Sequence, residues 1–189
     1  MNDNIQKTQF AINEPVKDYL PNSNDRINLK KQLTKMENDF IEIPIIIGGQ
    51  EFYTNSIGKC VKPHDHRHIL AEYSMANTKI INDAINVALK AWNEWSKTSL
   101  DARTEIFRKA ANLLAGPWRD IINAATMLNQ SKNVYQAEID SACELIDFFN
   151  FNSQFAEEIY NNQPLISPNN INNMLEYRSL EGFVFAVSP

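Results

Sequence analysis

The sequence predicts an α/β fold that consists mainly of a helical layer, with small β-hairpins before the layer and a pair of strands after it. Three patterns predict this class. Apolar residues recur with helical spacing through much of residues 77–160, strand-like residues surround the pair Gly48-Gly49, and a dense apolar run covers residues 183–187. A helical layer with so little sheet beneath it indicates that the chain forms one part of a larger packed architecture.

The first 24 residues are predicted to form an extended arm. They are polar, contain Pro15 and Pro21, and show no sustained period. A helix is expected to follow, with Asn24 or Asp25 as its N-cap. Its weak apolar side consists of Ile27, Leu29, Leu33, Met36 and Phe40.

Two hairpins are predicted after this helix. Residues 43–47 and 51–53 form the arms of the first, because the adjacent glycines at 48 and 49 tolerate the positive φ of a tight turn. Residues 59–62 and 69–73 form the arms of the second, and residues 63–68 connect them.

Four helices are predicted between residues 77 and 160. The first is capped by Asn77, the second begins near Ser99 and ends at Gly116-Pro117, the third runs from about 118 to 128, and the fourth from about 134 to 160. The expected apolar face of the first helix is Ile80, Ile81, Ala84, Ile85, Ala88, Trp92 and Trp95, and that of the second is Ile106, Phe107, Ala110, Leu113 and Leu114.

These elements divide the chain into an arm (1–24), a helical and hairpin portion (25–174) and a strand pair (175–189). Within the last region, Phe183–Val187 has the pattern of a buried strand that leaves a sheet at Ser188-Pro189. Loops at that position in a sheet usually carry chemistry.

Composition and charge exclude several classes of protein. The formal net charge is -5 and the basic residues are dispersed, which argues against nucleic acid as a partner. No apolar run approaches the roughly 20 residues of a membrane span. Cys60 and Cys143 are too few for a disulfide framework, and the N-terminus shows neither a signal peptide nor an Arg-rich transit peptide, so the residues alone indicate the cytoplasm.

The histidines of the sequence HDHRH are the first candidate site. His64, His66 and His68 alternate beside Asp65, which is compatible with zinc. The further ligands of a specific site are missing at any recognisable spacing, so a solvated loop is favoured and no metal ligand is assigned.

The remaining candidates also favour structural roles. Cys143 lies among apolar residues on a predicted helix and indicates a buried, inert thiol, while Cys60 has no base near it in sequence. The three tryptophans are expected in the core. Four acids are expected on the solvated side of the last helix: Glu138, Asp140, Glu144 and Asp147.

Five segments carry a specific resemblance: NEPVKDYL, IPIIIGGQEFYT, RTEIFRKAANLLAGPWR, QAEIDSACELIDFFNFNSQFA and LEYRSLEGFVFAVSP. In one collinear register from about Asn13 to Pro189, the chain resembles the N-terminal portion of the Δ1-pyrroline-5-carboxylate dehydrogenases, the glutamate-semialdehyde branch of the aldehyde dehydrogenase superfamily. The fold that this resemblance implies includes the first strand of a truncated Rossmann-like sheet.

The resemblance implies NAD-dependent oxidation of glutamate γ-semialdehyde to glutamate in proline degradation, commonly in mitochondria. In such enzymes a cysteine thiolate attacks the aldehyde, an asparagine stabilises the oxyanion, and a glutamate activates water. The nucleophile, the general base and the oxyanion asparagine have no counterparts in these 189 residues, so no catalytic residue is assigned. The resemblance implies a role for two residues. Ser188 aligns with a serine whose backbone lies along the NAD site, and Glu144 aligns with an acid near the substrate entrance.

We therefore expect a truncated or fragmentary Δ1-pyrroline-5-carboxylate dehydrogenase that does not catalyse the reaction or bind NAD firmly by itself. Expected partners are a small-molecule substrate and either further copies of the chain or a full-length enzyme. The alternative function is a non-catalytic module that docks on a full-length aldehyde dehydrogenase through its unpaired apolar strand. A helical metal-binding protein built around HDHRH is the third hypothesis.

Overall fold

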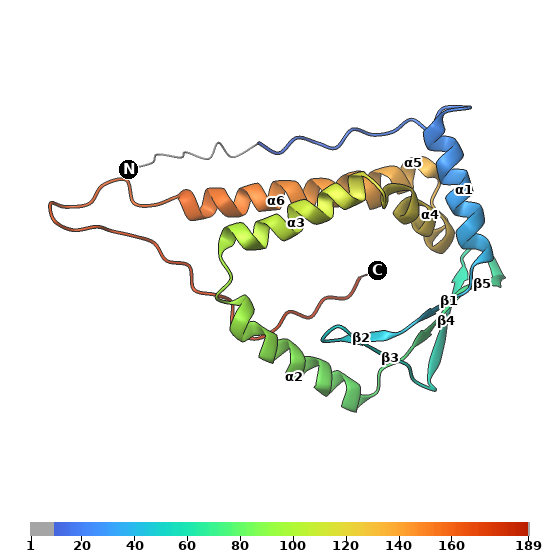
Figure 1. Cartoon of the computed structure of the whole chain (residues 1–189), viewed down its shortest axis with the longest axis horizontal. Coiled ribbons are helices and arrows are strands. Elements are labelled where there is room, and N and C mark those ends of the chain that lie inside the picture. The colour runs from blue at the N-terminus through green and yellow to red at the C-terminus, as the bar shows by residue number, and fades with distance from the viewer. Residues whose placement is uncertain (1–9, 189) are drawn as a thin grey trace.

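The computed structural model describes residues 10–188, and Figure 1 shows their arrangement. Helices α3 and α6 lie side by side, α1 and α4 pack together at one end of this pair, and the strands lie beyond α1. Helix α2 lies apart from the other helices. The elements are α1 (Asn24–Asn38), β1 (Ile41–Ile43), β2 (Ile45–Ile47), β3 (Gln50–Phe52), β4 (Ile57–Lys62), β5 (Asp65–Ser74), α2 (Thr78–Trp95), α3 (Leu100–Ala115), α4 (Arg119–Gln130), α5 (Val134–Ala137), the π-helix η1 (Glu138–Cys143) and α6 (Glu144–Asn161).

The predicted helices form, and local signals fix most of their ends. The side chains of Asn77 and Ser99 accept hydrogen bonds from the first turns of α2 and α3, and α3 ends at Gly116. The cap predicted for α1 is wrong by one or two positions, because Ser23 is the residue whose Oγ accepts the hydrogen bond from the Arg26 N–H.

The strands form two small sheets. The first predicted hairpin is confirmed as β2–β3, with φ of 58° at Gly48 and 79° at Gly49 in its turn. The second is confirmed as the antiparallel pair β4–β5, but its connection is only Pro63-His64, since the strand β5 already begins at residue 65. The strand β1, which pairs in parallel with β5, was not predicted.

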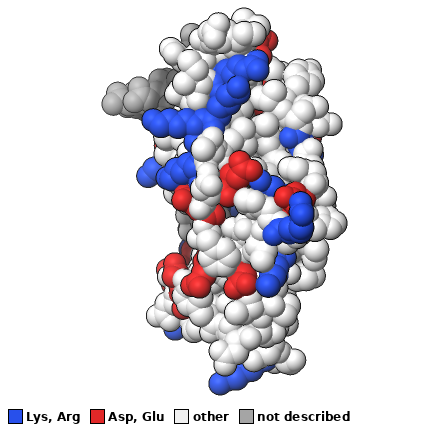
Figure 2. Space-filling model, turned by 90° about the vertical axis from the view of Figure 1, so that its right-hand side faces the viewer, with Lys and Arg blue, Asp and Glu red and all other residues white. Residues whose placement is uncertain are grey.

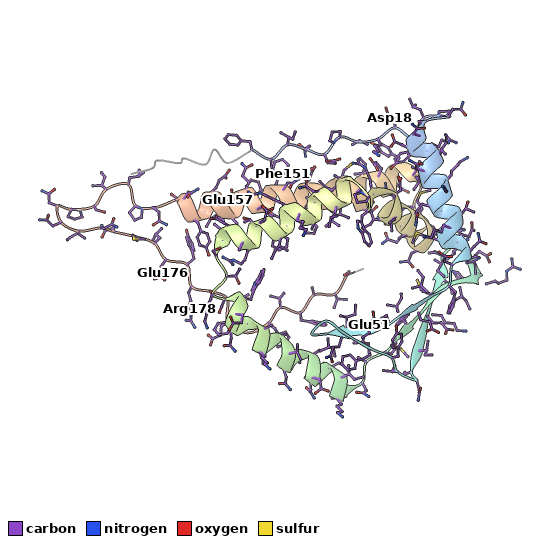
Figure 3. All side chains as sticks on the ribbon, in the orientation of Figure 1. Asp18, Glu51, Phe151, Glu157, Glu176 and Arg178 are labelled. Carbon is purple, nitrogen blue, oxygen red and sulfur yellow. The ribbon has the colours of Figure 1, made fainter. Side chains whose placement is uncertain are left out.

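The closing strand pair predicted for residues 175–189 does not form in residues 175–188. Phe183–Val187 is exposed and outside regular secondary structure. A strand requires a neighbour that accepts and donates its ladder hydrogen bonds, and no described strand lies beside this run. Figure 3 labels Glu176 and Arg178 on this irregular segment, which returns from the end of α6 toward α2.

Two predictions about the core are wrong. Trp95 and Trp118 are exposed, and Trp92 is only half buried. Helix α2 has no buried residue at all, so its predicted apolar face is open in the described structure. On α3, the buried residues are Thr104 and Ala111, while Ile106, Phe107 and Leu113 of the predicted stripe are exposed.

The buried core is accordingly small and lies in two clusters. One joins Tyr19, Leu29 and Ala124, between the arm, α1 and α4. The other joins Ala111, Ala142 and Ile146, where α3 packs on the helix that contains η1 and α6. Many large apolar side chains remain outside both clusters.

The surface at the α1 end of the molecule is charged. Figure 2 shows Lys and Arg side chains interspersed with Asp and Glu on this face, and the part described there shows no continuous basic stripe. Among the helices of residues 10–188, none combines the length and the apolarity that a membrane crossing requires.

We call the region where the arm, α4 and η1 meet the helical end. The fully buried carboxylate of Glu138 lies at its centre. It forms an ion pair with the buried Arg119 and accepts hydrogen bonds from the Lys17 N–H (2.8 Å), the Tyr19 hydroxyl (2.8 Å) and the Asn123 amide (2.7 Å). The prediction that Glu138 lies on the solvated side of its helix is therefore wrong.

The arm is held along the helices by the same polar groups. Arg119 also forms an ion pair with Glu14 and donates to the Pro15 carbonyl at 2.7 Å. Further along, the Asp147 carboxylate accepts from the Glu14 N–H at 2.7 Å, and the Gln154 side chain accepts from the Ala11 N–H at 2.6 Å. Residues 11–19 therefore lie along the helix from η1 to the middle of α6 (Figure 1). The first nine residues of the predicted arm lie outside the described residues.

Burial and pairing act on the pKa of Glu138 in opposite directions. Burial favours the neutral acid, but the hydrogen bonds from Arg119, the Lys17 N–H, Tyr19 and Asn123 together outweigh it and lower the pKa of Glu138 below its ordinary value of 4.5. Burial of the Tyr19 hydroxyl and the neighbouring Glu138 charge raise the pKa of Tyr19. Glu138 is therefore ionised in the folded protein.

We predict that Glu138→Ala lowers the free energy of unfolding by about 3–5 kcal/mol, because it leaves Arg119 as a buried charge without its main partner. Urea denaturation followed by circular dichroism measures the change. The matched control is Asp140→Ala, since Asp140 pairs with Lys132 at 2.7 Å on the same helical segment but its side chain is 41% exposed. That control should lose no more than about 1 kcal/mol; equal losses in the two variants would contradict the prediction.

The lowered pKa also sets the sign of a pH effect. Because the folded pKa of Glu138 lies below the ordinary 4.5, the stability that it contributes is fully present above that value and is lost as the pH falls through the folded pKa. Urea midpoints measured between about pH 3 and about pH 7 should fall more steeply at the acid end for the unmodified chain than for Glu138→Gln.

Candidate functional site

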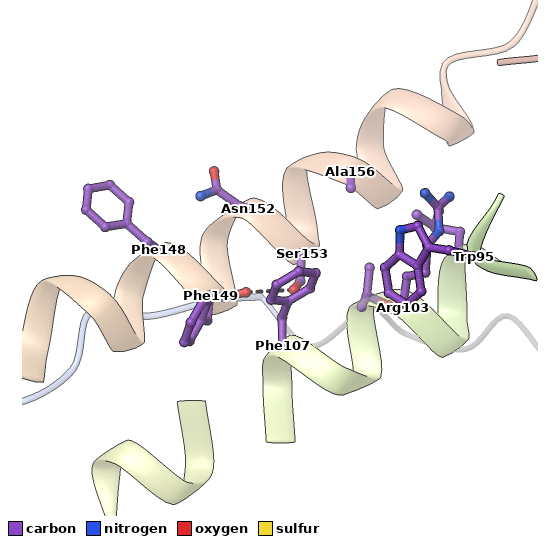
Figure 4. A pocket seen from close by; sticks show the side chains of 10 residues that line it. Trp95, Arg103, Phe107, Phe148, Phe149, Asn152, Ser153 and Ala156 are labelled. Atoms are coloured by element: carbon purple, nitrogen blue, oxygen red, sulfur yellow. Dashed lines mark hydrogen bonds between the residues drawn. The ribbon is translucent and has the colours of Figure 1, made fainter. Parts of the chain in front are cut away.

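Glu144, which the resemblance relates to the substrate entrance, is the first residue of α6 and is exposed. Its N–H donates to the Ile139 carbonyl, the i→i+5 bond that closes the π-helical segment. Phe148 and Asn152 follow at intervals of four residues, so the three side chains share one side of α6. Figure 4 shows Phe148 and Asn152 on that side.

A hollow of about 440 Å³ begins one helical turn after Glu144, between α3 and α6. Four of its ten lining residues are aromatic, and one of them, Trp95, the last residue of α2, lies at one end of the hollow (Figure 4). The lining residues are Trp95, Leu100, Arg103, Thr104, Phe107, Phe148, Phe149, Asn152, Ser153 and Ala156.

The polar groups around the hollow are mostly engaged with the protein itself. The Arg103 guanidinium donates to the Tyr160 hydroxyl at 3.3 Å, and the Ser153 Oγ donates to the Phe149 carbonyl at 2.6 Å. Nearby, Arg108 and Glu157 form an ion pair at 2.5 Å that links α3 to α6. Of the ten residues that line the hollow, none is a cysteine, histidine or carboxylate, so the Thr104 and Ser153 hydroxyls have no general base among these residues to activate them.

Ser188, the residue carried over to the NAD site, is exposed at the end of the irregular segment. Dinucleotide phosphates are usually held by backbone N–H groups where a strand of a parallel sheet turns into a helix. Ser188 follows no strand in residues 10–188, and Glu144 lies on a different element, at the start of α6. The strand-to-helix turn that usually holds dinucleotide phosphates is thus not present at Ser188 among the described residues.

The two cysteines differ in their surroundings. Cys143 is buried, and burial together with the Glu138 charge raises the pKa of its thiol to about 11. The prediction that this thiol is buried is confirmed. Cys60 is half buried in β4 and its thiol donates to the Asn129 side chain at 2.8 Å.

The histidines of HDHRH contact the protein instead of one another. His64 Nδ1 lies 2.7 Å from the Ser131 Oγ, and His68 Nε2 lies 2.9 Å from the Glu37 carbonyl. In residues 10–188 no three His, Cys, Asp or Glu side chains are grouped so as to hold a metal ion.

The residues that sequence reasoning missed are those of the buried pair, Glu138 and Arg119. On a regular α-helix, Glu138 and Cys143 lie about 140° apart, but the π-helical turn brings them onto one side, with the Sγ 3.8 Å from the carboxylate. The small residues Ala137 and Ala142 beside them, both fully buried, were the one local signal that this side packs closely.

Comparison with known proteins identifies the family. The model of a family described as the aldehyde dehydrogenase family matches residues 53–189. The chain belongs to the aldehyde dehydrogenase family. Its fold is an N-terminal portion of the aldehyde dehydrogenase fold, as the resemblance implied.

Relatives within this family are named after one reaction. The chain is 43% identical over 178 residues to the probable Δ1-pyrroline-5-carboxylate dehydrogenase of Schizosaccharomyces pombe, and 43% identical over 185 residues to the mitochondrial enzyme of that name from Bos taurus. These alignments cover 94% and 98% of this chain but 32% of each relative. The chain thus spans about a third of the length of the curated relatives that it matches.

Solved structures give the same result for the aldehyde dehydrogenase fold. The Δ1-pyrroline-5-carboxylate dehydrogenase of Mycobacterium tuberculosis matches with a TM-score of 0.84 and 41% identity, over 89% of this chain and 31% of that chain. A second structure of the same enzyme, bound with NAD, matches with a TM-score of 0.84 and 42% identity, over 88% of this chain and 31% of that one. The predicted resemblance to these dehydrogenases is confirmed.

We predict that the two thiols react at very different rates in the folded chain. With a pKa of about 11, the Cys143 thiol is only roughly 0.1% ionised at about pH 8, and it is also buried. Titration with a chromogenic disulfide should therefore show one fast thiol, which Cys60→Ser removes, and a second thiol that reacts only after denaturation. A fast thiol that persists in Cys60→Ser would contradict this assignment.

Proposed function

We propose that this chain is the N-terminal third of a Δ1-pyrroline-5-carboxylate dehydrogenase, an enzyme that oxidises glutamate γ-semialdehyde to glutamate with NAD in proline degradation. The observation that carries the proposal is the 43% identity to the Schizosaccharomyces pombe relative over 94% of this chain. An aldehyde dehydrogenase fold alone is compatible with many aldehydes, whereas relatives at this identity share one named reaction.

In this proposal the chain supplies structure and positioning, and the rest of the fold supplies the chemistry. Glu144 is placed at the substrate entrance, which is supported by its exposure at the start of α6 beside the aromatic hollow. Ser188 is placed beside NAD when the rest of the nucleotide-binding sheet is present. No residue of the chain is given a catalytic role, because the pKa of the buried Cys143 thiol is raised and the lining of the hollow contains no cysteine, histidine or carboxylate.

The proposed partners are the small-molecule substrate and further copies of the same enzyme in a homo-oligomer. Relatives named mitochondrial, from Bos taurus and Homo sapiens, support a mitochondrial location as the proposal, with the cytoplasm as its alternative.

A chimera tests the proposed function directly. Residues 1–189 replace the matching segment of the Schizosaccharomyces pombe relative, and NADH formation from Δ1-pyrroline-5-carboxylate is followed by absorbance. We expect kcat/KM within about tenfold of that of the unmodified relative, because volume-conserving changes in packing are tolerated. The 189-residue chain alone should produce no NADH. A folded chimera without activity would refute the proposal.

The proposed role of Glu144 gives a sharper test in the same chimera. Glu144→Gln removes the charge and keeps the shape, so it should raise KM for the substrate by about three- to tenfold and leave KM for NAD unchanged. Glu105→Gln is the matched control, since Glu105 is also an exposed helical glutamate but lies on α3. If the two variants behave alike, Glu144 does not belong to the substrate entrance.

A further inference from the structure

Three carboxylates follow one another on the surface of the helix that carries the proposed substrate entrance. Asp140 lies four residues before Glu144 and Asp147 lies three residues after it, so both are its neighbours on the helix surface. Like charges at these spacings destabilise a helix unless other groups offset them. The partners of the two outer acids therefore decide how the middle one is presented.

The first outer acid, Asp140, has a local partner. Its carboxylate pairs at 2.7 Å with Lys132, which lies just before α5, and the two side chains are 41% and 31% exposed. Solvated pairs of this kind contribute little to holding a helix in place. Asp140 thus neighbours Glu144 without connecting it to a distant part of the chain.

The second outer acid, Asp147, is bound by the arm. One oxygen of its carboxylate accepts from the Glu14 N–H and the other from the Asn13 side-chain amide, both at 2.7 Å. Glu14 also forms the ion pair with the buried Arg119, which donates to the Pro15 carbonyl. Asp147 is therefore attached, through two residues of the arm, to the buried centre of the helical end.

The arm binds the helix on both sides of Glu144. Every third residue of the arm donates its backbone N–H to a side chain of this helix, and the acceptors are Gln154, Asp147 and Glu138. An extended chain with three residues per turn presents every third residue to the same side. Because Glu138 precedes Glu144 and Asp147 follows it, the helical segment that carries Glu144 is held at both of its ends.

We propose that Asp147 is a positioning residue for Glu144. By binding the backbone of the arm, Asp147 fixes the turn of α6 that carries Glu144. Among residues 10–188, no hydrogen bond or ion pair uses the Glu144 carboxylate, whereas both outer acids are paired. The turn is thus held without engaging the group that meets the substrate. This inference rests on the proposed function, in which Glu144 lies at the substrate entrance.

Two matched variants in the chimera test this role. Asp147→Ala and Asp140→Ala each remove one negative charge beside Glu144, but only Asp147→Ala releases the arm. We expect Asp147→Ala to raise KM for Δ1-pyrroline-5-carboxylate by about three- to fivefold and to leave kcat and KM for NAD unchanged, because only the substrate entrance is displaced. Asp140→Ala should keep KM within about 1.5-fold.

Two further variants separate positioning from a general loss of packing. Asp147→Asn keeps an oxygen that accepts the Glu14 N–H, and the Asn13 amide can turn to accept from the new NH2 group, so KM should stay within about twofold of the chimera. In a chimera that already carries Glu144→Gln, Asp147→Ala should raise KM no further, since it acts through the Glu144 carboxylate. A merely structural role would make the two effects multiply.

Hydrogen exchange measures the structural step without activity. In the folded chimera, the backbone amides of residues 144–151 should exchange about three- to tenfold faster in Asp147→Ala than in Asp140→Ala, because the arm no longer restrains this part of the helix.

Three results would each overturn the inference: equal changes of KM in Asp147→Ala and Asp140→Ala, multiplied effects of Asp147→Ala and Glu144→Gln, or unchanged exchange in Asp147→Ala. In an active chimera these results leave the proposed reaction intact. If Glu144→Gln has no effect on KM, the role of Glu144 and this inference fail together. An inactive folded chimera refutes the proposed function, and there the exchange experiment still decides whether the arm holds this turn.

Discussion

The buried pair of Glu138 and Arg119 is the interaction on which the helical end of this structure depends. A carboxylate removed from water is tolerated only if its charge and its lone pairs are matched, and here the groups that match Glu138 of η1 come from the arm and from α4. The pair therefore fixes three separate parts of the chain to one point. The π-helix η1 is followed directly by Glu144. The buried pair therefore also sets the position of this residue, which is proposed for the substrate entrance.

This polar centre also explains how so small an apolar core is sufficient at that end of the molecule. The two core clusters contain few large side chains, and the fully buried groups include Glu138 and Asn123 along with Ile146. Hydrogen-bonded networks of this kind are directional and specify one arrangement. The opposite end, at α2 and the segment after α6, has neither such a network nor a buried cluster, and there the apolar side chains remain exposed.

Local features of this fold could be predicted from the sequence, and distant pairings could not. The caps at Asn77 and Ser99 and the glycine turn between β2 and β3 depend on residues a few positions apart, so their patterns were sufficient. The parallel pairing of β1 with β5 and the pairing of Glu138 with Arg119 join elements that no local period relates. The run Phe183–Val187 has a correct strand pattern, but a strand forms only beside a neighbour. Glu144 and Ser188 were placed by resemblance alone, and no spacing in this chain would have found them.

The same burial that stabilises the helical end removes its reactive groups from chemistry. Cys143 is the residue most like a nucleophile, yet the Glu138 charge and the loss of water hold its thiol neutral. Glu138 is ionised, but every hydrogen bond that keeps it ionised also makes it unavailable as a base. Glu144, by contrast, is an exposed carboxylate, and in the proposed function it attracts or orients the substrate without breaking a bond. In the proposed function this part of the fold therefore positions the substrate, and the rest of the aldehyde dehydrogenase fold supplies the groups that oxidise it.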